Sequence, residues 1–241
     1  MASEPRHRAM IVAHGQPSDP APAEADLARL AAAVAAYLPD WLVTSATLAT
    51  EGALASATTG PRGFVYPMFM AGGWFTKTHL PDRLSAAGAG AWHILAPFGL
   101  DPDVQALTVT IAQEACKNHS LAQTEVLLAA HGSFRSSAPS DVAFAMVGTL
   151  QTAGFARVGA GFIDQSPRIA EIAASFGPQA ICLPFFAAKG GHVVDDLPKA
   201  LAEAGFAGQL LQPVGLDPRV PALIAEALQK ALHQATVAAS G

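Results

Sequence analysis

Cysteine is scarce in this sequence, with only Cys116 and Cys182 among 241 residues. Two isolated thiols exclude a disulfide framework and a cysteine cage for a metal, and so few cysteines favour a reducing compartment. The first residues lack the apolar stretch and the small-residue cleavage site of a secretory signal. We therefore expect a cytoplasmic protein.

Charged residues and long apolar runs are also few. Charged residues make up 14% of the chain, and 14 basic against 19 acidic side chains give a net charge of −5. This acidic balance argues against nucleic acid as a partner. The most apolar segment, residues 27–38, contains Arg29 and is shorter than the roughly 20 residues that cross a bilayer. It predicts an amphipathic helix, and no membrane is expected as a partner.

An internal repeat is the strongest pattern in the sequence, and self-similarity of this kind determines the architecture. Landmarks of the first half return in the same order at offsets of 117, 117 and 116 residues: His14-Gly15 at His131-Gly132, Pro67 at Pro184, and Pro97 at Pro213. The chain therefore divides into two tandem halves, 7–120 and 121–238.

Each half alternates short apolar runs, bounded by Gly or Pro, with longer helical patterns, which is typical of βαβ units. We expect an α/β fold of two similar domains, each with a mainly parallel sheet flanked by helices. In the second half the predicted strands are residues 126–130, 158–163, 180–183 and 209–211. The predicted helices run from Pro139 to about Thr152, from Ser166-Pro167, and from Pro218 onward.

Three polar side chains follow predicted strands of the second half. His131 follows the first strand, Asp164 follows the second, and His192 comes eight residues after Pro184. Ligands of parallel sheets bind beyond the carboxyl ends of the strands. Two imidazoles and a carboxylate suit a transient divalent metal site.

Glycines beside these histidines permit a positive φ or the close approach of a flat ligand; they are Gly132, Gly190 and Gly191. They lack the spacing of a dinucleotide fingerprint or a P-loop, and no G-x-S-x-G elbow is present. ATP, NAD and a serine hydrolase are therefore not predicted, and Ser133 is interpreted as a turn residue.

The segments that carry these residues, 131–133, 162–167 and 184–193, together resemble the sirohydrochlorin chelatases (CbiX-like), class II tetrapyrrole chelatases, in a tandem two-domain form. The resemblance implies two parallel-sheet lobes around a cleft. It implies a lyase that inserts Co²⁺ or Fe²⁺ into sirohydrochlorin or a related tetrapyrrole during cobalamin or siroheme biosynthesis. His131 and His192 would hold the metal and act in catalysis with Asp164, where the family usually has Glu. The metal would be a substrate, with no permanent cofactor.

The first half departs from this pattern. Phe75 aligns with His192 and Ala49 aligns with Asp164, so that His14 alone is retained. Glu51 lies two residues past the position that matches Asp164. We interpret the first half as degenerate and the second as the active-site half, and we count His14 among the candidate substrate contacts.

A carboxylate-rich tetrapyrrole requires local cations in an acidic chain. Arg135, Arg168 and Lys189 are the candidates, because arginine in particular binds carboxylates in bidentate fashion. Gly191 completes the candidate substrate contacts, since a residue without a side chain admits a ligand close to the backbone. The candidate apolar walls are Trp74, Phe75, Phe185 and Phe186, although such residues beside strands more often belong to the core.

Two alternatives stay open. A protein that keeps the chelatase fold but only binds tetrapyrrole or metal would show the same pattern. Phosphoryl transfer through a histidine has less support, because His14 and His131 follow alanine instead of arginine. The choice of metal, the exact tetrapyrrole and the general base are not determined by sequence. Single-domain relatives pair as dimers, so a fused tandem chain favours a monomer.

Overall fold

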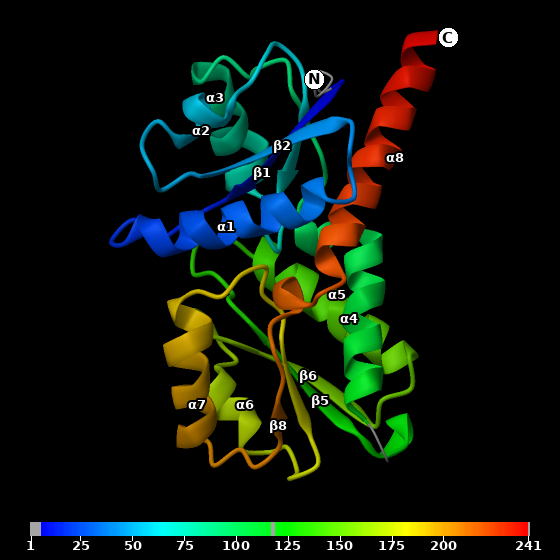
Figure 1. Ribbon diagram of the computed structural model, residues 1–241. Helices are drawn as coiled ribbons and strands as arrows, with labels where there is room; N and C mark the ends of the chain where they lie inside the picture. Colours follow the sequence, from blue (N-terminus) through cyan, green and yellow to red (C-terminus); the bar gives the residue numbers. More distant parts are fainter. Residues whose placement is uncertain (1–5, 117–118, 241) are drawn as a thin grey trace. The chain divides into compact units, whose positions relative to one another are not determined.

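The computed structural model describes residues 6–116 and 119–240 and divides them into two compact units (Figure 1). The first unit holds the described residues up to Phe98 together with those from Pro218 onward, and the second runs from Gly99 to Asp217. Each unit contains a four-stranded sheet flanked by helices, and every strand pair is parallel. The predicted α/β fold is confirmed.

The first sheet has the strand order β2-β1-β3-β4. Its strands are β1 (His7–Ala13), β2 (Trp41–Thr47), β3 (Phe64–Pro67) and β4 (His93–Ile94). Met10 and Val12 of β1 pack in one apolar cluster with Leu54 of α2 (Ala53–Ala57) and Leu80 of α3 (Leu80–Ala86). Alternate residues of β1 point to the opposite face, and there α1 (Pro20–Ala35) and α8 (Val220–Ser240) contact the sheet and each other.

The second sheet repeats this arrangement in the order β6-β5-β7-β8. Its strands are β5 (Glu125–Ala130), β6 (Arg157–Phe162), β7 (Ile181–Pro184) and β8 (Gln209–Leu210). On one side lie α6 (Ile169–Ala173) and α7 (Leu197–Glu203), and on the other lie α4 (Pro102–Ala115) and α5 (Ala138–Thr152), as Figure 1 shows. Both faces of the parallel sheet are therefore covered, as buried parallel strands require.

The helix that closes each sequence half packs in the unit formed by the other half. Helix α4, which ends the first half, contacts α5 and β7, whereas α8, which ends the second half, contacts α1 and β3. The halves 7–120 and 121–238 thus describe the sequence repeat, while the compact units are built with the two closing helices exchanged.

Most predicted elements of the second half coincide with observed ones, but two helix starts differ. The Ser166-Pro167 pair does not open a helix: the carbonyl of Pro167 accepts the Phe162 N–H at 3.0 Å, and α6 begins after its N-cap residue Arg168, whose backbone is extended. The closing helix begins at Val220, two residues after Pro218. No helix in the described part of the chain is long and apolar enough to span a membrane.

Candidate active site

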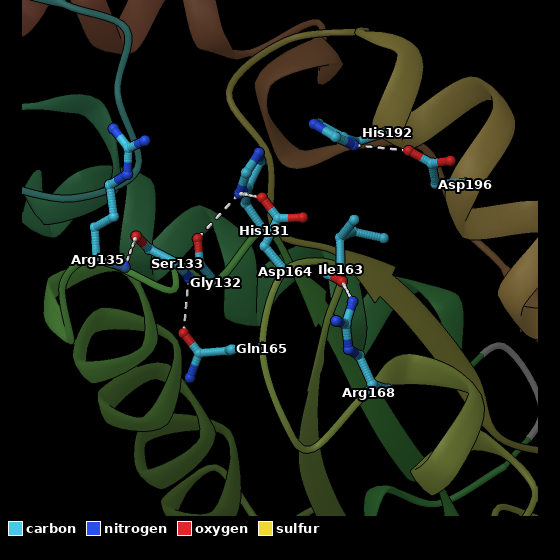
Figure 2. A network of polar contacts seen from close by, with 10 residues as sticks. All are labelled: His131, Gly132, Ser133, Arg135, Ile163, Asp164, Gln165, Arg168, His192 and Asp196. Atoms are coloured by element: carbon cyan, nitrogen blue, oxygen red, sulfur yellow. Dashed lines mark hydrogen bonds and ion pairs between the residues drawn. The ribbon is translucent and has the colours of Figure 1, made fainter.

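The strand order of the second sheet brings the predicted site residues to one edge. Strand β5 lies between β6 and β7, and His131 directly follows β5. Asp164 lies two residues beyond β6, and His192 opens a π-helical turn, His192–Asp196, that follows β7. The carboxyl ends of these parallel strands share one edge. Figure 2 shows the side chains gathered there.

The two imidazoles are in direct contact. The ring centroids of His131 and His192 lie 4.5 Å apart, with the ring planes at 87°. Both side chains are 45% exposed to solvent. An imidazole nitrogen binds a divalent ion at about 2.1 Å, which puts the ion roughly 3 Å from the ring centroid, so two rings at this spacing can share one ion. The predicted convergence of these residues is observed, and their catalytic and metal-binding roles stay predictions.

Each imidazole has a carboxylate beside its Nδ1 atom. The His192 Nδ1 lies 2.7 Å from Oδ2 of Asp196, and the His131 Nδ1 lies 3.5 Å from Oδ2 of Asp164. The His131 Nδ1 is also 3.0 Å from the carbonyl oxygen of Gly132. A proton on Nδ1 satisfies these acceptors and leaves the Nε2 lone pair of both rings for a ligand. Carboxylate–histidine pairs of this kind orient metal-binding imidazoles.

Backbone hydrogen bonds hold Asp164 next to His131. The Ile163 N–H donates to the Ala130 carbonyl at 3.1 Å, and the Asp164 N–H donates to the His131 carbonyl at 2.9 Å. The pairing between β5 and β6 therefore continues past the ends of both strands. It fixes the histidine and the carboxylate as neighbours irrespective of side-chain rotamer.

The turn after His131 depends on a glycine and on Gln165. Gly132 has a φ of +73°, and a Cβ atom there would lie 2.7 Å from Cγ of Gln165. The Gln165 side chain accepts the Ser133 N–H at 2.8 Å, and the Ser133 hydroxyl accepts the Arg135 N–H at 3.1 Å. Ser133 is thus part of the turn. Gly191, unlike Gly132, has a negative φ of −52°.

The three candidate cations differ in what surrounds them. The Arg168 guanidinium donates to the Ile163 carbonyl and lies 5.3 Å from the ring centroid of Phe134. The Arg135 and Lys189 side chains are exposed and have no partner within the described residues. Arg135 and Lys189 are therefore available for a ligand, whereas Arg168 is already engaged with the protein. Their roles in substrate binding stay predictions.

The first unit has the same local geometry as the candidate site but different side chains. His14 contacts Phe75 edge-on, with centroids 4.9 Å apart and planes at 80°, close to the geometry of the histidine pair. The Ala49 N–H donates to the His14 carbonyl at 2.9 Å, as Asp164 does to His131. This agreement supports the alignment of Phe75 with His192 and of Ala49 with Asp164.

Two candidate apolar walls are wrong, and the site has one feature that sequence analysis missed. Phe185 and Phe186 are buried in the core, so they are not available to a ligand, whereas Trp74 and Phe75 are exposed. The missed feature is the contact of Asp196 with His192. The position of Asp196 four residues after His192 was the available signal, because this spacing brings side chains together on one face of a helix.

In the part of the chain that the structure describes, the two imidazoles and their carboxylates do not form a ready-made set of three or more metal ligands. No cluster of three or more His, Cys, Asp or Glu residues suited to a metal occurs within residues 6–116 and 119–240. Cys182, in β7, is fully buried, and this burial raises the pKa of its thiol to about 12. The thiol therefore stays protonated and unsuited to binding a metal at neutral pH.

Comparisons with known proteins found a matching family model and similar solved structures. The CbiX family model matches residues 125–231. The structure of CbiX, described as the terminal enzyme for biosynthesis of siroheme in denitrifying bacteria, is 47% identical in sequence and has a TM-score of 0.87. That match covers 93% of this chain and 99% of CbiX. A search of curated proteins gave no match.

More distant structures share the fold. SirB from Bacillus subtilis with Fe³⁺ has a TM-score of 0.74 at 15% identity, covering 93% of this chain and 95% of SirB. The sirohydrochlorin chelatase SirB from Bacillus subtilis subspecies spizizenii, in complex with cobalt, has a TM-score of 0.67 at 15% identity, covering 93% and 94% of the two chains.

Proposed function

Because this chain belongs to the CbiX family, we propose that its second unit inserts a divalent metal, Co²⁺ or Fe²⁺, into sirohydrochlorin or a related tetrapyrrole. The observation that carries the proposal is the contact between the solvent-exposed imidazoles of His131 and His192, each with a carboxylate at Nδ1. The metal is a substrate in this reaction, and the enzyme keeps no permanent cofactor.

The geometry suits transient binding of the metal. Two imidazole nitrogens leave most coordination positions of a divalent ion to water and then to the pyrrole nitrogens of the ring. Imidazole is a ligand for several divalent transition metals and does not select one by itself, and solved structures with the same fold are named with Fe³⁺ and with cobalt. We therefore propose both metals as substrates and leave the preference to experiment.

Insertion exchanges two pyrrole protons for one divalent ion, so the reaction needs proton acceptors. Asp164 and Asp196 are the carboxylates adjacent to the two imidazoles, and both are open to solvent. A carboxylate paired with imidazole can accept a pyrrole proton and pass it to water as the metal moves from the imidazole nitrogens to the pyrrole nitrogens. Arg135 and Lys189, which are exposed beside this edge, would contact substrate carboxylates.

Anaerobic absorbance spectroscopy tests the proposal. Purified protein is mixed with metal-free sirohydrochlorin and either Co²⁺ or Fe²⁺, and the spectrum of the metallated product is followed. We expect insertion well above the uncatalysed rate, and a fall to that rate in His131→Ala and His192→Ala. His233→Ala is the matched control, because this exposed histidine lies in α8 of the first unit.

The assay also separates catalysis from storage. If wild-type protein binds sirohydrochlorin or metal but inserts metal no faster than the uncatalysed reaction, the protein is a non-catalytic binding protein and the proposed enzyme activity is wrong. If His131→Ala and His192→Ala insert metal as fast as His233→Ala, the assignment of the site is wrong.

A further inference from the structure

Aromatic rings gather in the first unit where the second unit has its histidine and carboxylate. We call Phe69, Trp74, Phe75 and His79 the aromatic cluster. Trp74 and His79 are stacked, with centroids 4.8 Å apart and planes at 21°. Phe75 meets Trp74 edge-on at 5.1 Å and His79 edge-on at 5.4 Å. The rings therefore support one another in a fixed arrangement.

The cluster occupies the repeat position of the histidine–carboxylate pair. Phe75 and His79 open and close the π-helical turn Phe75–His79, as His192 and Asp196 open and close the turn His192–Asp196. With Phe75 in place of a histidine, this position cannot bind a metal as the second unit would. The backbone geometry is kept while the side-chain chemistry changes from metal ligands to aromatic rings.

The second unit has no side chain at the position that matches Trp74. Its counterpart at the same offset is Gly191, which carries no side chain. Trp74 is 62% exposed and Phe75 is 38% exposed. An exposed tryptophan forgoes most of the free energy that burial of its side chain would supply. These rings are positioned for a flat apolar partner that covers them.

The nearby charge indicates what kind of flat partner fits. Lys77 lies in the same π-helical turn, and its exposed side chain has no hydrogen-bond or ion-pair partner within the described residues. Its counterpart in the second unit is Val194. The indole ring of Trp74 can stack on the flat face of a conjugated macrocycle, and the adjacent ammonium group of Lys77 can pair with a carboxylate on its rim. A single indole face is large enough to stack on such a ring. It is too small to form a stable interface with another protein, which requires a much larger contact area.

We propose that the aromatic cluster binds the face of a carboxylated tetrapyrrole, with Trp74 as the stacking ring and Lys77 as a carboxylate contact. The choice of tetrapyrrole rests on the proposed function.

Binding of metal-free sirohydrochlorin, followed by the anisotropy of its own fluorescence under anaerobic conditions, tests this proposal. We expect Trp74→Ala to weaken binding about tenfold or more, as loss of a stacked aromatic ring does elsewhere. Trp74→Phe keeps a flat ring and stays within about threefold of wild type. Tyr37→Ala, which removes another ring of the first unit that is 55% exposed, should bind as wild type does.

Three results would overturn the proposal: wild-type protein that does not bind the metal-free ring, Trp74→Ala that binds it as tightly as wild type, or Tyr37→Ala that weakens binding as much as Trp74→Ala. Equal urea unfolding midpoints for the variants show that all are folded. If Trp74→Ala weakens binding of the ring although wild-type protein inserts no metal, the proposed role of the aromatic cluster is supported and the proposed enzyme activity is wrong. If metal is inserted but Trp74→Ala binds normally, only the cluster fails.

Discussion

Replacing Asp196 by alanine removes the carboxylate that orients His192 without disturbing the core. The carboxylate oxygen lies 2.7 Å from Nδ1 of the imidazole. Loss of such a partner commonly lowers metal affinity or activity by about 10 to 100-fold. At about 1.4 kcal/mol per factor of ten, this corresponds to roughly 1.4 to 2.8 kcal/mol of binding free energy.

The effect on folding should be much smaller. The His192 and Asp196 side chains are 45% and 52% exposed, so solvent screens their interaction. An exposed pair at this helical spacing contributes only about 0.3 to 0.5 kcal/mol to stability. Asp196→Ala should therefore lose metal affinity while its free energy of unfolding barely changes. Asp196→Asn keeps an oxygen acceptor for the imidazole and should fall between Asp196→Ala and wild type.

Asp195→Ala provides the matched control. Asp195 lies in the same π-helical turn, is exposed, and carries the same charge, but it has no hydrogen bond with His192 among the described contacts. The dissociation constant for Co²⁺ is measured by isothermal titration calorimetry, and the free energy of unfolding is measured in urea. Equal Co²⁺ affinities for Asp195→Ala and Asp196→Ala would refute the reasoning, because the loss would then depend on net charge and not on orientation of the ring.

Further predictions concern the turn, the buried thiol and the first unit. Gly132→Ala places a Cβ atom at a φ of +73° against Gln165, and it should lower the free energy of unfolding in urea by about 1 to 2 kcal/mol. In the control Gly190→Ala, nothing lies within 4 Å of the added Cβ, so the free energy of unfolding should barely change. Equal losses in the two variants would contradict this prediction. Burial raises the pKa of Cys182 from 9.0 to about 12, so a thiol reagent at neutral pH should label it only in urea, as peptide mass spectrometry would show. The folded chain keeps this proton to higher pH than the unfolded chain, so the thiol's contribution to stability is lost between pH 9 and about 12. The free energies of unfolding of wild type and Cys182→Ala are compared over this pH range. A difference between them that stays constant would contradict the prediction. The double variant Phe75→His with His79→Asp should bind one more equivalent of Co²⁺ than wild type in calorimetry, and unchanged stoichiometry would argue against the equivalence of the two turns.

Much of the candidate site could be predicted from the sequence because parallel strands impose simple geometry. The repeat offset and the apolar runs located the strands, and residues that follow adjacent parallel strands must lie at one edge. The sequence therefore predicts that His131, Asp164 and His192 lie together, without knowledge of any contact. The same alignment identified Phe75 as the residue opposite His192.

Other features depend on contacts that sequence patterns do not specify. Phe185 and Trp74 are both aromatic residues that follow a strand, yet one is buried and the other exposed, because burial depends on what packs above each position. The pairing of Asp196 with His192 depends on the local helical geometry after Gly191. Helix α6 starts later than the Ser-Pro pair predicts, because the Pro167 carbonyl accepts the Phe162 N–H, a contact that the local preference of a Ser-Pro pair for a helix start does not reveal.

By itself, the sequence determined the α/β fold, the duplication and the residues able to bind a metal, since these follow from hydrophobic periodicity and from the chemistry of side chains. Tertiary structure alone decided that helices α4 and α8 are exchanged between the units, because a helix covers whichever sheet face offers it the better apolar contact, irrespective of its place in the repeat. It also decided that the two imidazoles turn their Nδ1 atoms toward carboxylates, since that orientation comes from side chains brought together only when the strands pair.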